Sequence, residues 1–249
     1  LVFLLTVDEP PRRPADAATV DEFSGKSLGG VLWQLACTPA FVWLTIGATC
    51  VTVVAMGRNF WEPTFLRRVY GMDAAEAGLW YALISPLPAA LGAWLCASLT
   101  DRLAARDRRW YGWFPALSAL LLVPLGLAFY LAPADVRVAG VPIGFFFSVA
   151  ASLVGAGWAP ATMAVAQGLV PPSARAVTAA TWSMISSFVG QGLGPLVVGD
   201  LNIRLAPDYG DEAVRYSLVA VSVLPLLAVA SYLLLARTLG SGRAGNDPS

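Results

Sequence analysis

The sequence predicts an all-α membrane protein with six transmembrane helices. Hydrophobic residues make up 57% of its 249 positions and charged residues 13%, whereas soluble domains contain roughly 45–50% and 25%. Charge-free stretches of about 20 residues, the length that crosses a bilayer, recur along the chain. Backbone groups in hydrocarbon must find partners within their own segment, and the sequence shows no sustained period-two alternation, so helices are favoured over strands.

Six spans are expected in the following order. The first runs from Ser27 to Gly57, with its helix beginning near Trp33. The other five are Gly78–Thr100, Tyr111–Ala134, Val138–Ala174, Ala176–Gly199 and Tyr216–Ala236, with a loop folded into one end of the span that begins at Val138. The bundle is therefore expected to occupy residues 33–238.

The segments outside the bundle predict a multi-part chain. Residues 1–7 are interpreted as the end of a preceding transmembrane helix. Residues 8–32 are rich in Pro, Ala and Asp, a composition typical of a linker. Residues 239–249 are expected to form a tail. The chain is accordingly predicted to be a fragment of a longer protein.

Basic residues predict the orientation, because Lys and Arg collect on the cytosolic side of a membrane. Placing both ends of the bundle in the cytosol puts ten basic residues inside, namely Arg12, Arg13, Lys26, Arg102, Arg106, Arg108, Arg109, Arg175, Arg237 and Arg243. It leaves five outside, namely Arg67, Arg68, Arg137, Arg204 and Arg215. The linker and the tail are therefore predicted to be cytosolic, in a multi-pass protein of the bacterial inner (cytoplasmic) membrane.

Composition also argues against several classes of protein. Formal net charge is zero, so the charge balance indicates no nucleic-acid partner. Histidine is absent, and Cys37, Cys50 and Cys96 lie in apolar stretches without paired spacing, which argues against a metal site or a disulfide framework. Without a catalytic constellation the chain is predicted not to be an enzyme, and no cofactor is expected.

Five segments in order resemble the carboxyl-terminal half of a major facilitator superfamily transporter, with the nearest likeness to its spinster-like branch. They are TVDEPPRR (6–13), FWEPTFLRRVYGMDAAEAG (60–78), SLTDRLAARDRRWYGWFPA (98–116), GLVPPSARAVTAA (168–180) and GQGLGPLVVGDL (190–201). The resemblance implies helices seven to twelve of a twelve-helix fold, with a small-molecule substrate bound between two six-helix halves in the bilayer. The implied partner is the missing amino-terminal six-helix half.

The loop after the second span resembles the short cytosolic signature of that superfamily. Asp101 and Arg102 match its acidic and first basic positions, and Arg106 belongs to the basic cluster that follows. Two departures are Ala97, where the family has Gly, and the run 103–105, which replaces a Gly inside the loop. The resemblance implies a conformational latch, in which Asp101 faces a helix N-terminus of the missing half. The alternative is a positive-inside loop that sets only topology.

Arg58 and Glu62 form an ionisable pair within the first span, and Asn59 adds a second polar group. Residues four apart share a helix face, and Pro63 is expected to break the helix just beyond. An intramembrane pair of this kind indicates a functional site, with Arg58 holding an anionic group and Glu62 carrying a proton. Two alternatives stay open. Arg58 lies about 38 Å beyond Trp33 and can anchor the helix at the outer interface, or the pair contacts the missing half.

Helices ten and eleven of the implied fold carry small and polar faces. Ser148, Ser152, Gly155, Ala159 and Thr162 line one face, and Gly157 with Pro160 supplies a place to bend. The next helix presents Ser183, Ser187, Gln191 and Gly194, followed by Pro195. Ser187 and Gln191 either line a cavity or pack against a helix, whereas packing is favoured for the glycines.

Aromatic residues divide into two groups by their position in the spans. Trp80, Tyr81, Trp110, Tyr111, Trp113 and Tyr130 lie near span ends, as interfacial aromatic belts do. Trp158 and Trp182 lie farther inside, where they either shape a cavity or fill the core.

The function predicted from these features is secondary active transport of a small organic or amphipathic solute by alternating access. An anionic solute and coupling to protons are the two refinements of this function that the sequence leaves open. The alternative is a six-helix half-module that pairs with itself to form a symmetric transporter or channel. A reading frame upstream of Leu1 that encodes six more helices would separate the two.

Overall fold

The computed structural model describes residues 28–170 and 174–241. The predicted end of a preceding helix, most of the predicted linker and most of the predicted tail lie outside these residues. The helices are α2 (Leu28–Cys37), α3 (Pro39–Val69), α4 (Ala74–Ile84), α5 (Pro86–Ala104), α6 (Trp110–Leu131), α7 (Ile143–Gly155), α8 (Trp158–Gly168), α9 (Arg175–Tyr209), α10 (Ala213–Val221) and α11 (Pro225–Ser241). A 3-10 turn covers Gly210–Glu212, and a hairpin joins β1 (Arg137–Val138) to β2 (Val141–Pro142).

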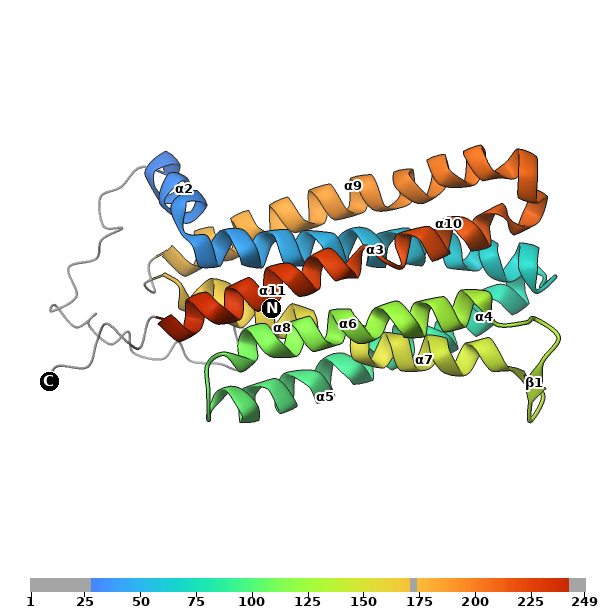
Figure 1. Cartoon of the computed structure of the whole chain (residues 1–249), viewed down its shortest axis with the longest axis horizontal. Helices are drawn as coiled ribbons and strands as arrows, with labels where there is room; N and C mark the ends of the chain where they lie inside the picture. The colour runs from blue at the N-terminus through green and yellow to red at the C-terminus, as the bar shows by residue number, and fades with distance from the viewer. Residues whose placement is uncertain (1–27, 171–173, 242–249) are drawn as a thin grey trace, which may run out of the picture.

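Apart from the short helix α2, the described helices form six roughly parallel rods (Figure 1). Three rods are single helices, α3, α6 and α9, and three are helix pairs, α4 with α5, α7 with α8, and α10 with α11. Each rod lies in an apolar stretch long enough to span a bilayer, and the last such stretch, Arg175–Leu239, holds both α9 and the α10–α11 pair. The prediction of an all-α membrane protein with six spans is confirmed.

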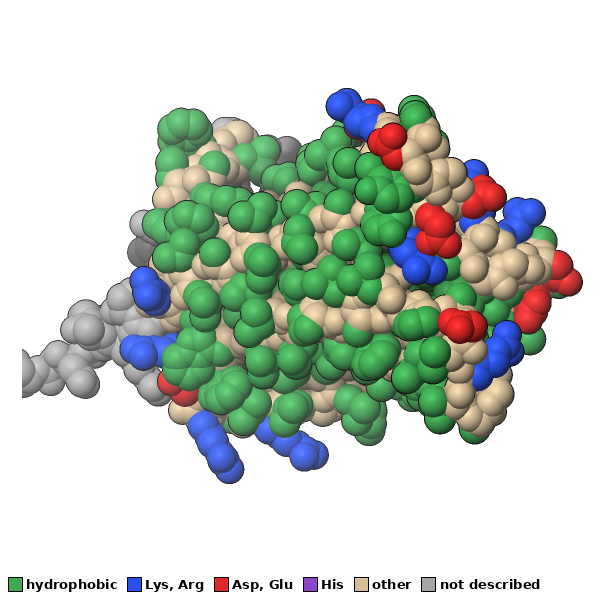
Figure 2. All heavy atoms as spheres, turned by 45° about the vertical axis from the view of Figure 1, so that its right-hand side comes forward, with side chains coloured by type: hydrophobic (Ala, Val, Ile, Leu, Met, Phe, Trp, Pro, Cys, Tyr) green, Lys and Arg blue, Asp and Glu red, His purple; other side chains and the backbone are tan. Residues whose placement is uncertain are grey.

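Charged side chains gather at the two ends of the bundle, and apolar side chains cover the middle of the face shown in Figure 2. One end, here named the arginine-rich end, holds the α5–α6 turn, the start of α9 and the end of α11 (Figure 1). Its described basic residues are Arg102, Arg106, Arg108, Arg109, Arg175 and Arg237. The other end, here named the hairpin end, holds β1, β2 and the Gly210–Glu212 turn. A belt of apolar surface between polar ends matches a bilayer.

Helix α3 corrects the expected limits of the first span. It begins at Pro39, whose missing N–H is harmless in the first turn, and Trp33 lies in the separate helix α2. It continues past Gly57 to Val69, so the expectation that Pro63 breaks the helix is wrong. Phe65 and Leu66, just beyond this proline, are fully buried, and their packing holds the helix together across one missing hydrogen bond.

Two further boundaries differ from the expectation. Residues Val138–Pro142, expected at the start of a span, form the hairpin, with Gly140 in the left-handed region that its tight turn requires. Helix α9 runs ten residues past Gly199 to Tyr209. An ion pair between Asp200 and Arg204 joins successive turns there, with Nε and Oδ2 2.8 Å apart.

Prolines divide two rods into helix pairs. The second rod is interrupted at Ser85, before Pro86 and Pro88. Pro88 cannot donate to the carbonyl of Ile84, four residues earlier. Ser152 and Ser148 of α7 donate to that carbonyl instead, at 3.1 and 3.5 Å.

The fourth rod is interrupted between Gly155 and Trp158, next to the predicted bend at Gly157 and Pro160. Pro160 has no N–H for the carbonyl of Ala156, which explains the interruption. A Cβ added to Gly157 would lie 2.8 Å from Cβ of Cys96, so the glycine lets α5 come close at this point. Bending of the rod at this point during transport stays a prediction.

Candidate functional site

Arg58 and Glu62 meet inside the bundle. Arg58 lies 19 residues after Pro39, about 28 Å along α3, and its Nε and Nη2 both lie 2.8 Å from Oε1 of Glu62. The Arg58 side chain is 11% exposed and that of Glu62 is fully buried. An interfacial anchor would extend toward the membrane surface, whereas this guanidinium turns inward to its partner.

Tyr130 of α6 completes the cluster. Its hydroxyl donates to the same Oε1 of Glu62 at 2.7 Å. Three donated contacts therefore meet on one carboxylate oxygen, while the other, Oε2, is buried without a hydrogen-bond partner among the described residues. Tyr130 is itself fully buried, so its assignment to an interfacial aromatic belt is wrong.

A small cavity of about 140 Å³ adjoins the cluster. It lies between α3, the α4–α5 junction, α6 and the α7–α8 junction. Its lining is Val51, Val54, Ala55, Arg58, Asn59, Ser85, Ala89, Leu122, Ala151, Ser152, Gly155, Ala156 and Trp158. Of the predicted site residues, the structure brings Arg58, Asn59, Gly155 and Trp158 together in this wall. Asn59 also accepts a hydrogen bond at 3.3 Å from Tyr81 of α4.

The cavity combines one guanidinium with mostly apolar walls, a combination suited to a small solute that carries an anionic group. The two rods that prolines divide meet at this cavity, through Ser85 on one side and Ala156 on the other. Backbone irregularity at membrane depth is tolerated where it lines a cavity or is buried in protein. Among the described residues, no group of three His, Cys, Asp or Glu side chains is placed to hold a metal ion.

Comparison with known proteins identifies the family. The model of the Major Facilitator Superfamily matches residues 1–195. The chain belongs to the major facilitator superfamily. It is 31% identical over 233 residues to an MFS-type efflux pump of Mycolicibacterium smegmatis, covering 93% of this chain and 51% of that protein. It is 25% identical over an alignment of 255 residues to protein spinster homolog 1 of Bos taurus, covering 94% and 47%.

Two solved structures of a bacterial homologue of the human lysosomal transporter Spinster are also similar. The inward-facing, unoccupied form is 25% identical with a TM-score of 0.74, and the match covers 96% of this chain and 56% of that chain. The inward-facing, occupied form is 26% identical with a TM-score of 0.66, covering 95% and 54%. The predicted spinster-like branch, the half-transporter fold and the prediction that the chain is not an enzyme are confirmed.

The chain spans about half the length of the curated relatives that it matches. In this facilitator half, α3 corresponds to helix seven of the implied fold and α7 with α8 to helix ten. The cavity beside Arg58 therefore lies within one half of the fold.

The predicted site residues of α9 lie apart from this cavity. Trp182 is buried in the core, with its ring centroid 6.4 Å from that of Trp158. Gly194 faces α3, whereas Ser187 is half-buried and Gln191 exposed. A carbonyl oxygen on this helix, that of Pro195, accepts a hydrogen bond at 3.0 Å from Nε1 of Trp61. Cavity lining by Ser187 and Gln191 stays a prediction about the assembled transporter.

The predicted latch residues lie at the arginine-rich end. Asp101 is near the end of α5 and exposed, and its Oδ1 accepts a hydrogen bond at 3.3 Å from the hydroxyl of Tyr111. Arg102 and Arg106 are exposed as well, and neither forms an ion pair within residues 28–170 and 174–241. All three side chains are therefore accessible to a partner. The latch itself stays a prediction.

Replacing Tyr130 with phenylalanine should destabilise the protein. The substitution removes the hydroxyl that donates to Glu62, and hydrogen bonds to charged groups contribute about 1.5–3 kcal/mol. We expect the free energy of unfolding in detergent to fall by about 1.5 kcal/mol. Tyr232→Phe is the matched control, because Tyr232 is equally buried and its hydroxyl has no hydrogen-bond partner among the described residues. Equal losses of unfolding free energy in Tyr130→Phe and Tyr232→Phe would contradict the hydrogen bond from Tyr130 to Glu62.

Proposed function

We propose that this chain is the carboxyl-terminal half of a secondary transporter that moves a small organic or amphipathic anion by alternating access, coupled to protons. The observation that carries the proposal is the buried contact between Arg58 and Glu62 at the wall of a cavity. Arg58 would hold the anionic group of the solute, and Glu62 would carry the proton. Asn59 and Trp158 would complete the binding wall.

The Glu62 carboxylate and the anionic solute would compete for Arg58, and this competition would couple solute binding to proton binding. While Glu62 is ionised, it occupies the guanidinium through two contacts of 2.8 Å. Protonation removes the negative charge from Glu62, and the free Oε2 is an oxygen on which the proton can reside. Arg58 is then available to an anion from the cavity. A buried charge is costly without a partner, so loading of a proton and loading of an anion favour each other.

The second half of the transporter would supply the remainder of the binding site. Support comes from the coverage of the relatives, since this chain spans 51% of the efflux pump and 47% of the spinster homologue. Superfamily transporters bind substrate at the interface of two halves near the bilayer midplane. The proposed partner is therefore an amino-terminal six-helix half, encoded upstream of Leu1.

The orientation proposed for the bundle places the arginine-rich end in the cytosol of a bacterium, by the positive-inside rule. At that end, Asp101 would latch against a helix N-terminus of the other half, with Arg102 and Arg106 beside it. Its exposure and its weak contact of 3.3 Å with Tyr111 leave the carboxylate available for this role.

Proteoliposomes that contain the full-length transporter test the proposed function. A panel of carboxylate- and phosphate-bearing organic solutes is offered, with their uncharged amides or alcohols as controls. We expect a proton gradient to accumulate at least one anion above its equilibrium level, and a protonophore to abolish the accumulation. Anion transport at the same rate and to the same level with and without the proton gradient would contradict proton coupling. Transport restricted to the uncharged controls would contradict the role of Arg58.

A further inference from the structure

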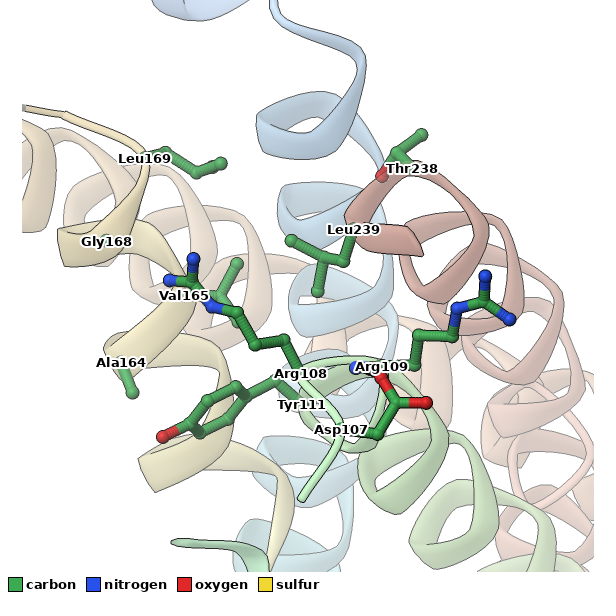
Figure 3. Close-up of a pocket in the computed structure, with 10 residues that line it drawn as sticks. All are labelled: Asp107, Arg108, Arg109, Tyr111, Ala164, Val165, Gly168, Leu169, Thr238 and Leu239. Carbon is green, nitrogen blue, oxygen red and sulfur yellow. Dashed lines mark hydrogen bonds between the residues drawn. The ribbon is translucent and has the colours of Figure 1, made fainter. Parts of the chain in front are cut away.

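A second cavity lies at the arginine-rich end, on other residues than those of the cavity beside Arg58. Its volume is about 630 Å³, and it opens between the start of α6, the end of α8 and the end of α11 (Figure 3). The lining residues are Asp107, Arg108, Arg109, Tyr111, Ala164, Val165, Gly168, Leu169, Thr238 and Leu239. None of them takes part in the transport site proposed above.

Two arginines flank this cavity from the α5–α6 turn. In Figure 3 the side chain of Arg108 extends toward α8, beside Val165 and Gly168, whereas that of Arg109 extends toward α11. Neither guanidinium forms an ion pair within the described part of the chain. Two positive charges against the single carboxylate of Asp107 leave the lining of this cavity with a net positive charge, which favours an anion.

The one carboxylate in this lining, that of Asp107, has a structural role in the α5–α6 turn. Oδ1 of Asp107 accepts a hydrogen bond from the backbone N–H of Arg109 at 2.9 Å, which holds the turn. The helices toward which the arginines extend also bring apolar side chains to the lining, with Val165 on α8, Leu169 just after it and Leu239 on α11. A site that combines net positive charge with aliphatic side chains suits an amphipathic anion better than a simple ion.

We propose that this cavity binds a phosphate group with net negative charge, with Arg108 as its ligand, whereas Arg109, whose side chain extends toward α11, adds positive charge at the edge of the cavity. The chemistry is shared by the headgroup of an anionic phospholipid and by a free phosphate ester. The apolar wall favours the lipid, whose acyl chains would run along Leu239 and Leu169. That the lipid belongs to the cytosolic leaflet rests on the orientation proposed above, whereas the binding itself does not.

Lipid binding to the purified chain in detergent tests this site. The probes are dioctanoyl phosphatidic acid, dioctanoyl phosphatidylcholine and glycerol 3-phosphate, each titrated and followed by native mass spectrometry. We expect phosphatidic acid to bind, and Arg108→Gln to weaken it roughly 10- to 100-fold, the factor expected for loss of a hydrogen bond between charged groups. Arg175→Gln removes the same charge at the same end of the bundle but outside the cavity lining, so binding should stay within about twofold of the original.

The three probes separate the sources of the phosphate. If phosphatidic acid binds tightly and glycerol 3-phosphate does not, the cavity is a lipid site. If both bind equally, it is a site for free phosphate esters. Either result supports the phosphate site when Arg108→Gln weakens it. Equal weakening by Arg108→Gln and Arg175→Gln, or binding of phosphatidylcholine as tight as that of phosphatidic acid, would overturn it. Arg108→Lys, which keeps the charge, should recover part of the affinity and shows that the cavity is folded.

Discussion

Replacing Glu62 with glutamine should abolish solute accumulation driven by a proton gradient, while the anionic solute still binds. Glutamine has nearly the shape of the carboxylic acid, so it can still accept the hydrogen bond from Tyr130 that Glu62 accepts at 2.7 Å. It carries neither a negative charge nor a transferable proton. The variant therefore resembles the protonated state, in which Arg58 is free for the anion, and it holds that state at every pH.

Two measurements on the Glu62→Gln variant test the proton role of Glu62. In proteoliposomes, uptake against a gradient should fall to the level of empty vesicles, whereas exchange of labelled for unlabelled solute should continue. In a binding titration, affinity for the anion should become independent of pH in Glu62→Gln, whereas it should vary with pH in the unmodified protein. Glu76→Gln, an exposed carboxylate at the start of α4, is the matched control. Gradient-driven accumulation that survives in Glu62→Gln would remove the proton role.

The positions of the spans could be predicted because burial in a bilayer imposes a composition that is visible in sequence. The ends of the spans could not be predicted in the same way, because a hydropathy criterion ends a span at its first charged residues. In α3 these charges are Arg58 and Glu62, which neutralise each other within the bundle. In α9 the helix also continues across a pair of opposite charges, Asp200 and Arg204. A pair of opposite charges four residues apart is compatible with a continuing helix.

The candidate site was only partly predictable, because some of its contacts join residues that lie far apart in the sequence. Arg58 and Glu62 lie on one helix, so their spacing alone indicates a shared face. Tyr130 lies 68 residues later and its role depends on how α6 packs against α3. The repair of the Ile84 carbonyl by Ser152 likewise joins residues 68 apart. Pro88 signals the missing donor in sequence, but the donor that replaces it is set by tertiary packing.

The tight crossing of α3 and α9 depends on two glycines that face each other. A Cβ added to Gly194 would overlap the carbonyl oxygen of Val53 and lie 2.8 Å from the backbone N of Gly57. A Cβ added to Gly57 would lie 3.1 Å from the carbonyl oxygen of Gly194. Backbone meets backbone here, so no flexible side chain can give way. Small residues at such a crossing permit the close approach that stabilises helix pairs in membranes.

Gly194→Ala should therefore be strongly destabilising. Overpacking lowers the free energy of unfolding by about 1–3 kcal/mol and occasionally more. Because the added Cβ would overlap backbone atoms, we expect Gly194→Ala to lower it by about 3 kcal/mol or more. For a chain of this size that corresponds to a fall of roughly 6–12 °C in the melting temperature. Thermal unfolding in detergent, followed by tryptophan fluorescence, measures it.

Gly192→Ala supplies the control within the same helix. A Cβ added at Gly192 meets no atom within 4 Å, and the residue is exposed. Both substitutions gain the same helix propensity, about 1 kcal/mol in favour of alanine, so the difference between them isolates the contact with α3. We expect the melting temperature of Gly192→Ala to stay level or rise. If Gly194→Ala were equally tolerated, the close crossing would be wrong, and with it the placement of Arg58 against the cavity that α3 helps to form.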